Sequence, residues 1–382
     1  MTKLKQKIEK FLSIRVEGHE PDKILILTVI GIILFGLVML TSASGGYAYL
    51  RYHDGYYFLK HQLEALLIGV LGCYFFSRYN YHNLRRLSFW MLVVSVLLLV
   101  LVFVPGLSSA ANFKARSWIN VFGFSLQPSE LVKLTFLIYL AGWLEGRKQK
   151  QLEDFSQGLL PFLSVLGLIA ILMLKQPDFG TFFIILVVSL TVFYVSGGNL
   201  KHLLGLGALG FLFLLLAVKA MPYQMDRINC YLEPSGKADS ACYQVNQALI
   251  AIGSGGLWGR GFGESRQKMM YLPEVSGDSI FAIISEELGL FFSLAIVAGF
   301  IFLFWRGVRI AKRAPDNFGK TLALGISTWL AVQALINIGG MSNLLPMTGV
   351  PLPFISFGGS AIMAALIALG VLINISKQTR SQ

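Results

Sequence analysis

The segment 271–289, YLPEVSGDSIFAIISEELG, places acidic side chains at the entrance of an apolar stretch. Its four carboxylates are Glu274, Asp278, Glu286 and Glu287, and the residues that follow the segment are almost purely apolar. Ionisable groups inside a membrane are costly, and they usually mark either a functional site or an internal ion pair. Asp278 can alternatively be a helix N-cap, and Glu286 and Glu287 are expected to pair inside a helical bundle.

Two further pairs of charges lie at the ends of predicted helices. Glu130 and Lys133 open an apolar run in LQPSELVK, and Lys175 and Asp178 belong to the turn KQPDFGT. Together with the acids of 271–289, these charges gather toward one end of the predicted bundle, which indicates a site there. As an alternative, Glu130 and Lys133 pair on one helix face because they are three residues apart, and KQPDFGT is only a tight connection.

The apolar runs that must position these charges recur along the whole chain. Of the 382 residues, 55% are hydrophobic and 14% are charged, which excludes an ordinary soluble domain. Runs without strict alternation predict helices rather than a β-barrel, and no cleavable signal peptide is apparent. We therefore predict an all-α polytopic membrane protein with about ten transmembrane helices. The predicted runs are 24–43, 62–78, 86–105, 129–145, 158–175, 179–196, 201–220, 279–305, 321–343 and 354–375.

The distribution of Lys and Arg predicts how these helices are oriented. With a cytoplasmic N-terminus, most basic residues of the short connections fall on the cytoplasmic side, so we expect both termini to be cytoplasmic. The formal net charge of +12 then reflects this bias and attraction to anionic lipids, and it does not indicate nucleic acid. The predicted parts are the cytoplasmic segments 1–23 and 377–382 and the membrane domain 24–376, whose loop 221–277 is extracytoplasmic.

The loop 221–277 contains two cysteines and a glycine-rich stretch that basic residues follow. Glycine-rich backbone can turn amide groups toward a phosphate, and nearby cations add charge; a flexible loop with solvated cations is the alternative. Cys230 and Cys242 form either a disulfide outside the cytoplasm or two free thiols. The cations are Arg260, Arg266 and Lys268.

Common motifs of soluble enzymes are missing from the sequence. It contains no H-E-x-x-H, C-x-x-C or G-x-S-x-G, and its five histidines are scattered. The tripeptide GKT (319–321) is not part of a Walker A motif, because Ala314 stands where the first glycine is needed. These observations argue against an ATP-driven enzyme and against a metallohydrolase.

Five motifs follow one another along the chain. They are RSWINVFGFSLQPSELVKL (116–134), KQPDFGT (175–181), QALIAIGSGGLWGRGFGESRQK (247–268), YLPEVSGDSIFAIISEELG (271–289) and NIGGMSNLLPMTGVPLPFISFGGSA (337–361). Taken together and in this order, they resemble one family, the SEDS family of FtsW and RodA proteins. The likeness extends from TSAS (41–44) to the last predicted helix. The chain departs from the family pattern beside Asp278, where Gly277 replaces a threonine and Ser279 replaces an aromatic residue.

The resemblance implies a peptidoglycan glycosyltransferase that polymerises lipid II in the bacterial cytoplasmic membrane. Its implied partners are lipid II, a class B penicillin-binding protein that acts as the transpeptidase, membrane lipids, and proteins of the divisome or elongasome. Asp278 would deprotonate the attacking sugar hydroxyl, and Glu130 and Lys133 would be an internal pair that shapes the cavity. Cations, or a divalent metal ion such as Mg²⁺ or Mn²⁺, would assist the departing pyrophosphate. The substrate-binding candidates are Arg116, Lys175, Asp178, Gln247, Arg260, Arg266 and Lys268.

The sequence leaves two alternative functions open. YYFLKHQL (56–63) and SRQK (265–268) are more similar to FtsW, the division enzyme, whereas GVPLPFISFGGSA (349–361) also fits RodA, the elongation enzyme; we favour FtsW. A lipid II flippase or solute transporter is the alternative from a different class. A transporter should have polar sites near the membrane midplane and inverted internal repeats, and the sequence displays neither feature.

Overall fold

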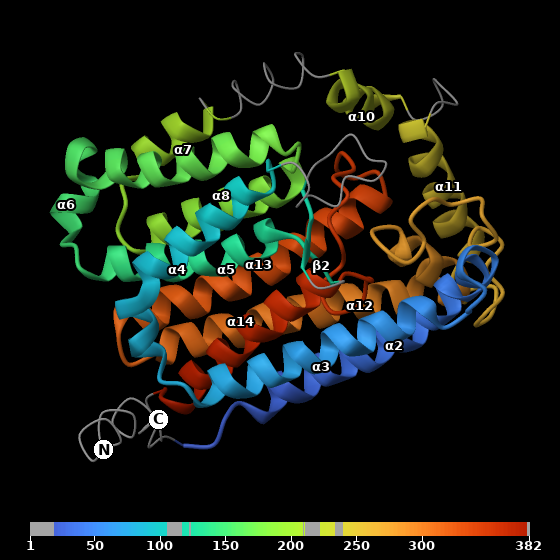
Figure 1. Ribbon diagram of the computed structural model, residues 1–382, viewed down its shortest axis with the longest axis horizontal. Coiled ribbons are helices and arrows are strands. Elements are labelled where there is room, and N and C mark those ends of the chain that lie inside the picture. Colours follow the sequence, from blue (N-terminus) through green and yellow to red (C-terminus); the bar gives the residue numbers. More distant parts are fainter. Residues whose placement is uncertain are drawn as a thin grey trace.

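The computed structural model describes residues 19–104, 117–121, 124–208, 210, 222–233 and 240–379. Long helices run side by side in a bundle, and α10 and α11, which belong to the predicted loop, lie toward one end of it (Figure 1). Within the described ranges, strand structure is limited to a short antiparallel pair in which Ile119 faces Leu126. The elements are α2 (Lys23–Tyr52), α3 (Tyr57–Arg78), α4 (Tyr81–Leu101), β1 (Ile119–Val121), β2 (Phe124–Leu126), α5 (Pro128–Glu145), α6 (Gln149–Glu153), η1 (Phe155–Leu159), α7 (Leu160–Lys175), α8 (Phe179–Val195), α10 (Pro222–Leu232), α11 (Ser240–Gly255), α12 (Ile280–Arg313), α13 (Asn317–Met341) and α14 (Gly359–Lys377).

These elements confirm the predicted all-α membrane fold, while the number of ten spans stays a prediction. In the part of the chain that the structure describes, six helices are long and apolar enough to cross a membrane, namely α2, α4, η1 with α7, α12, α13 and α14. Helix α8 is apolar but has only 17 residues, and α3 and α5 coincide with predicted runs. Of the predicted run 201–220, residues 201–208 and 210 are helical, and the others lie outside the described residues.

Several helices extend beyond the apolar runs that predicted them, and α2 and α12 do so at their C-terminal ends. Helix α2 continues to Tyr52, although its apolar run was expected to end at 43, and α12 continues to Arg313 rather than 305. The additional residues are mostly small, polar or basic, so they lower the hydropathy without breaking the helical hydrogen bonds. Hydropathy therefore locates the apolar part of a helix, whereas backbone hydrogen bonding sets its ends.

Short acidic side chains fix the starts of several helices. Asp22 accepts a hydrogen bond from the backbone N–H of Leu25 at 2.9 Å, and Asp316 accepts one from the backbone N–H of Gly319 at 2.7 Å. Such caps satisfy backbone donors that lack a partner in the first helical turn. They define where α2 and α13 begin.

Helices α13 and α14 form the centre of the bundle. In their most apolar windows, 72% and 78% of the residues are buried, against 22% for α12 and 33% for α2. Small residues allow the inner helices to approach closely: a Cβ at Gly370 of α14 would lie 2.4 Å from the carbonyl oxygen of Cys73 in α3. The outer helices direct most of their apolar surface outward, as a lipid environment requires.

The first and last described residues meet at one end of the bundle. The ring of His19 lies 2.8 Å from the hydroxyl of Thr379, and the backbone N–H of Asp22 donates to Ser376 Oγ at 3.2 Å. Asp22 also forms an ion pair with Arg306 of α12. These contacts place the start of α2 and the end of α14 on the same side of the bundle, while the assignment of that side to the cytoplasm stays a prediction.

Candidate functional site

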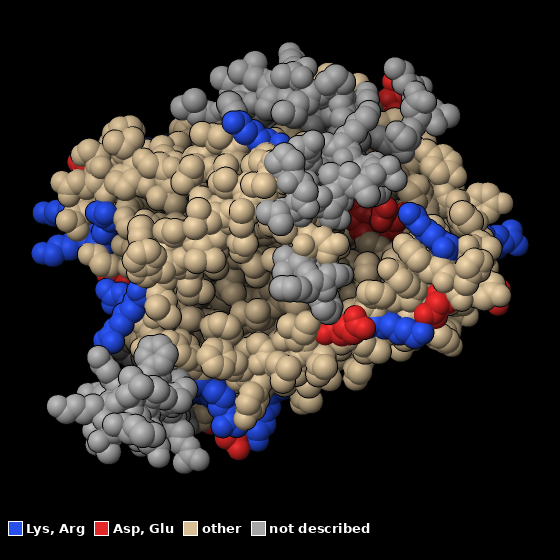
Figure 2. Space-filling view, viewed as in Figure 1, with Lys and Arg blue, Asp and Glu red and all other residues tan. Residues whose placement is uncertain are grey.

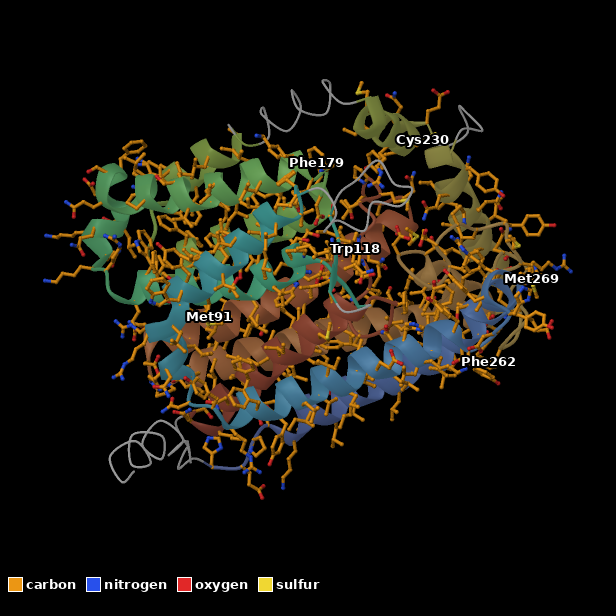
Figure 3. All side chains as sticks on the ribbon, viewed as in Figure 1. Met91, Trp118, Phe179, Cys230, Phe262 and Met269 are labelled. Atoms are coloured by element: carbon orange, nitrogen blue, oxygen red, sulfur yellow. A yellow bond between two sulfur atoms is a disulfide. The ribbon has the colours of Figure 1, made fainter. Side chains whose placement is uncertain are left out.

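A cavity of about 1680 Å³ lies among the acidic residues singled out above. Its wall is built by the end of α2, the starts of α3, α5 and α8, helix α10, and the segments 272–278 and 345–351. Figure 2 shows Asp and Glu atoms recessed in a hollow of the face that it draws, with Lys and Arg atoms beside them. Figure 3 labels two lining residues, Trp118 and Phe179, near the middle of the molecule. The acidic residues that line the cavity are Glu64, Glu130, Asp178, Glu274 and Asp278.

Asp278 lies in the loop directly before α12, outside the membrane-spanning helices. Its backbone carbonyl accepts a hydrogen bond from Asn337 Nδ2 at 2.8 Å, and its Oδ1 lies 3.4 Å from Gln244 Nε2. Burial, followed by the neighbouring Glu274 carboxylate, raises the pKa of this half-buried carboxyl to about 7, while Arg227 acts in the opposite direction. A carboxyl with this pKa can take up or release a proton near neutral pH.

The interpretation of Asp278 as a helix cap is wrong. The capping position of α12 is occupied by Ser279, and no side chain accepts a capping hydrogen bond there. Backbone bonds hold the turn instead, because Glu274 O accepts from the N–H of Gly277 at 3.0 Å and from that of Ser279 at 3.2 Å. The Asp278 carboxyl is therefore not required by the helix start and lines the cavity.

Arg227 on α10 is a cationic residue of this cavity that the sequence interpretation missed. It interacts electrostatically with Asp278 and donates from Nη1 to Met347 O at 3.2 Å. Gly349, with φ of 74°, lies beside both groups: a Cβ there would be 3.7 Å from Arg227 Nη2 and 3.7 Å from Asp278 Oδ2. No spacing pattern in MDRINC (225–230) marks this arginine, so only its position next to Asp278 reveals it.

Glu130 and Lys133 form a buried ion pair at the wall of the cavity. Lys133 Nζ lies 2.7 Å from Glu130 Oε2, and both side chains are 1% exposed. The same ammonium group donates to Gln333 Oε1 at 2.8 Å and lies 4.9 Å from the ring centroid of Trp329. Gln333 Nε2 in turn donates to Pro351 O at 2.9 Å. The pair thus connects α5 to α13 and to the segment that follows α13.

The two deeper acids of α12 hold the loop that precedes this helix. Lys268 Nζ lies 2.7 Å from Glu287 Oε1, and Ser42 of α2 donates to the same carboxylate at 2.8 Å. Glu286 accepts hydrogen bonds from two backbone N–H groups of the loop, at 3.0 and 3.2 Å. Both acids therefore have partners inside the bundle, as expected. Lys268 contributes to the cavity lining, but its charge is balanced by Glu287.

The glycines of 253–263 permit close packing against α12. A Cβ at Gly255 would lie 2.0 Å from one carbonyl oxygen of α12, and a Cβ at Gly259 would lie 2.2 Å from another. The backbone N–H groups of Arg260 and Gly261 donate to carbonyl oxygens of α12 at 2.9 and 3.0 Å. Because both amides are already bonded, the interpretation of this stretch as a phosphate cradle is wrong at these two positions.

Several predicted substrate-binding cations do not reach the cavity. Arg260 and Arg266 are exposed on the glycine-rich loop, and Lys175 is exposed at the end of α7; none of the three lines the cavity. Arg116 lies outside the described residues. The cationic group that the fold brings to Asp278 is Arg227.

Two polar candidates lie closer to the cavity. Asp178 lines it, but the carboxylate also caps α8 and accepts a hydrogen bond from Ser129 Oγ at 2.6 Å. Gln247 lies on α11 about one turn beyond Gln244, and it is Gln244 that approaches Asp278. Asp178 therefore joins α5 to α8. The glutamine next to Asp278 is Gln244, one helical turn before the predicted Gln247.

A disulfide joins Cys230 near the end of α10 to Cys242 in the first turn of α11, with the two Cα atoms 5.0 Å apart. Figure 3 labels Cys230 near the junction of the two helices. Helix α10 carries Arg227 and helix α11 carries Gln244, and both residues approach Asp278. The bridge therefore links two elements that build the site, while its sulfur atoms take no part in the lining.

The acidic side chains give limited support to a divalent cation. Within the described ranges, no group of three or more His, Cys, Asp or Glu side chains is arranged to hold a metal ion. Mg²⁺, however, commonly binds one or two carboxylates together with substrate phosphates and water. Glu274 and Asp278 interact with each other and both line the cavity, so they fit a cation that is shared with a phosphorylated substrate.

The helical bundle and its acid-lined cavity define a multi-pass α-helical membrane protein with room for a large ligand at one end. The cavity combines a titratable carboxyl with a neighbouring arginine. The chain belongs to the FtsW/RodA/SpoVE family of cell cycle proteins, whose family model matches residues 22–381.

Curated relatives resemble this chain over almost its whole length. Stage V sporulation protein E of Bacillus subtilis (strain 168) is 40% identical over 360 residues, which cover 94% of this chain and 98% of that protein. A protein of Trichlorobacter lovleyi named "Probable peptidoglycan glycosyltransferase FtsW" is 39% identical over 357 residues, which cover 94% of this chain and 93% of that protein.

Solved structures of the family share the fold. A chain from a study of how a peptidoglycan synthase complex coordinates polymerization and crosslinking has a TM-score of 0.77 and 26% identity, covering 95% of this chain and 99% of that chain. The rod shape determining protein RodA of Thermus thermophilus has a TM-score of 0.68 and 27% identity, covering 94% of this chain and 98% of that chain. These similarities confirm the predicted family and its helical architecture.

Proposed function

We propose that this protein is a peptidoglycan glycosyltransferase of the FtsW type, which polymerises lipid II during cell division. The observation that carries the proposal is the pairing of Asp278 with Arg227 beside Gly349, in a cavity large enough for a lipid-linked saccharide. The relatives support it, because the FtsW protein of Trichlorobacter lovleyi is named as a probable peptidoglycan glycosyltransferase.

In this reaction a hydroxyl group of the acceptor sugar attacks C1 of the donor sugar. A glycosidic C1–O bond forms, the bond between C1 and the phosphate oxygen breaks, and the lipid pyrophosphate leaves. Asp278 in its ionised form accepts the hydroxyl proton, and Arg227 offsets the negative charge that develops on the pyrophosphate. A divalent cation beside Glu274 would supply further Lewis-acid stabilisation of the same leaving group.

The other polar residues of the site position this centre. The Glu130–Lys133 pair shapes the wall between α5 and α13, and Asp178 fixes the start of α8. Lys268 and Glu287 hold the glycine-rich loop against α12. We therefore assign the pyrophosphate to Arg227 rather than to the exposed Arg260 and Arg266.

We place the site at the outer face of the bacterial cytoplasmic membrane, because the excess of Lys and Arg favours a cytoplasmic location for the opposite end of the bundle. The proposed partner is a class B penicillin-binding protein, since a structural relative was described in a complex that coordinates polymerization with crosslinking. Divisome proteins are the wider setting of an FtsW-type enzyme. A RodA-type role in elongation, with elongasome partners, is the alternative within the family.

Purified full-length protein in lipid vesicles that contain labelled lipid II tests the proposal. We expect glycan chains, seen as a ladder after gel electrophoresis. Movement of labelled lipid II between the leaflets without chain formation would identify a flippase and overturn the polymerase assignment.

A pair of arginine variants tests the assignment of the pyrophosphate. Arg227→Ala should strongly reduce chain formation, because the developing negative charge loses its cation. Arg260→Ala, which removes an exposed arginine outside the cavity, is the matched control and should polymerise normally. The reverse result would return the role to the glycine-rich loop.

A further inference from the structure

The side of the cavity formed by α2 and α3 takes no part in the reaction described above. Tyr47 and Arg51 are four residues apart on α2 and share one helix face, and Tyr57, His61 and Glu64 share one face of α3 in the same way. The tyrosine wall, as we call this side of the cavity, consists of Tyr47, Arg51, Tyr52, Tyr57, His61 and Glu64.

Packing holds the rings of the tyrosine wall in place. Tyr52 and Tyr57 stack with ring centroids 3.8 Å apart and planes 5° from parallel. Buried Phe58 contacts both rings edge-on and packs in turn against Phe357 at 4.9 Å. Because Phe357 belongs to the segment before α14, the two stacked rings are braced against the core of the bundle.

The tyrosine wall differs from an ordinary belt of interfacial aromatic residues. Such belts anchor helices at the lipid headgroups, and Tyr49 and Tyr56, which are 64% and 59% exposed and do not line the cavity, suit that role. The rings of the wall face the cavity and alternate with ionisable groups. A polyprenyl chain has no hydrogen-bonding groups for these residues, so the wall does not suit an apolar ligand.

A sugar unit matches both kinds of group on the wall. It presents an apolar face of C–H bonds, against which an aromatic ring can lie, and a rim of hydroxyl groups that need donors and acceptors. Arg51 offers N–H donors and Glu64 offers acceptor oxygens. The Nδ1 atom of His61 lies 2.9 Å from Tyr57 O, so the neutral ring offers its Nε2 atom as an acceptor. The combination of rings and polar groups therefore favours a saccharide.

Glu274 connects the tyrosine wall to the reacting centre. Its carboxylate interacts electrostatically with Arg51 on one side and with Asp278 on the other, and it lines the same cavity. The cavity volume of about 1680 Å³ exceeds the roughly 300–1,000 Å³ of an ordinary small-molecule site. More than one sugar unit can therefore lie between the wall and Asp278.

We propose that the tyrosine wall is a saccharide-binding subsite, which holds sugar units of a glycan chain next to Asp278. The identity of this saccharide as a glycan chain rests on the proposed function. The location of the subsite rests on the rings, the ionisable groups and the cavity that they line.

Calorimetric titration of full-length protein in lipid nanodiscs with a soluble β-1,4-linked N-acetylglucosamine tetrasaccharide tests the subsite. The probe has no pyrophosphate and cannot be polymerised, so only binding is measured. The double variant Tyr52→Ala, Tyr57→Ala should raise the Kd about tenfold, which corresponds to ~1.4 kcal/mol. Replacing both rings by Phe should retain most of the affinity, because the stacking surface remains.

The matched control is the double variant Tyr49→Ala, Tyr56→Ala. It removes one tyrosine of α2 and the tyrosine directly before α3, both outside the cavity, and should leave the Kd unchanged. If the Tyr52, Tyr57 alanine variant melts at a lower temperature, His61→Ala provides a second change on the exposed part of the wall, with an expected rise in Kd of several-fold. An absence of tetrasaccharide binding, or an equal loss in wall and control variants, would overturn the subsite.

The two proposals fail in different ways. Chain formation from lipid II, combined with an unchanged Kd in the wall variants, removes only the subsite. Tetrasaccharide binding that depends on the wall, combined with no chain formation, supports the subsite and removes the polymerase assignment.

Discussion

At the scale of single residues, the ionisable groups of the site differ in how completely they are neutralised. Lys133 is paired with Glu130, and Lys268 is paired with Glu287, all four inside the bundle. Asp278 is half-buried near a second carboxylate, that of Glu274, and these two effects raise its pKa to about 7. Arg227 lowers this pKa but does not cancel the increase. This difference separates a group that can transfer protons from groups that hold the structure together.

Removal or protonation of the Asp278 carboxylate should stop glycan synthesis. Asp278→Asn is nearly isosteric and should lower polymerisation by about 10²–10⁴-fold, the usual contribution of a general base. Because the pKa of Asp278 is raised to about 7, its base form is lost as the pH falls through 7. The rate of the unsubstituted protein should therefore rise with pH up to about 7 and then level off. Initial rates between pH 5.5 and 8.5 measure this, and a flat profile or an active, folded Asn variant would contradict it.

The Glu130–Lys133 pair should show strong coupling in stability. Breaking a buried pair from one side leaves an unpaired charge, which typically costs about 3–5 kcal/mol. The double variant Glu130→Ala, Lys133→Ala should therefore lose less stability than the sum of the two single variants. Thermal unfolding of all four proteins gives the coupling, and simple additivity would show that the two side chains do not interact.

At the scale of elements, α12 depends on the segment that precedes it. The helix kinks at Gly289, where φ is 78°, and the glycine-rich loop lies against that kink. Backbone bonds run in both directions, since Leu290 N donates to Gly256 O at 3.0 Å and Arg260 N donates to Glu286 O at 2.9 Å. The loop and the kink therefore form one structural unit just beyond Asp278.

Two glycines of α11 should respond very differently to the same substitution. Gly255→Ala places a Cβ 2.0 Å from the carbonyl oxygen of Ser285, whereas a Cβ at Gly253 meets no atom within 4 Å. We expect Gly255→Ala to destabilise the protein by about 1–3 kcal/mol, as overpacking usually does. Gly253→Ala lies in the same helix and should be neutral or stabilise it by up to about 1 kcal/mol. Melting temperatures of the two purified variants test the contrast, and equal values would disprove the close approach.

At the scale of the whole molecule, the two ends of the bundle differ: one joins the two ends of the described chain, and the other contains the cavity. At one end the ring of His19 contacts Thr379 and the N–H of Asp22 donates to Ser376, so the two ends of the described chain are held together. At the other end α2, α3, α5, α8, α10 and the segment before α12 surround the cavity. An inner pair of buried helices, α13 and α14, connects the two ends.

We expect both chain ends to be cytoplasmic and the glycine-rich loop to lie outside. In a Cys73→Ser background, Glu264→Cys should react with a membrane-impermeant maleimide in intact spheroplasts. Glu20→Cys and Thr379→Cys should react only after the membrane is permeabilised. The background protein itself should stay unlabelled, because Cys230 and Cys242 are joined in a disulfide. Labelling of Glu20→Cys and Thr379→Cys on opposite sides, or of Glu264→Cys only after permeabilisation, would refute this orientation.

The sequence alone determined the helical membrane fold and part of the site. Apolar segments long enough to cross a bilayer form helices, because the backbone N–H and C=O groups in lipid must be hydrogen-bonded within each segment. Local spacing was also enough for Glu130 and Lys133, since residues three apart on a helix are neighbours. Asp278 was a candidate because a carboxylate at the entrance of an apolar helix is energetically unfavourable, and such groups usually mark a functional site or an ion pair.

Only the tertiary structure decided which distant groups meet that carboxylate. Arg227 and Gln244 reach Asp278 from α10 and α11, and Gly349 provides the space between arginine and carboxylate. Neither periodicity nor motif spacing encodes such contacts, because they depend on how separate helices pack. The glycine-rich loop illustrates the same limit: its composition fits a phosphate cradle as well as a packing surface. The carbonyl oxygens of α12, which accept the amides of Arg260 and Gly261, are the physical reason that packing prevails.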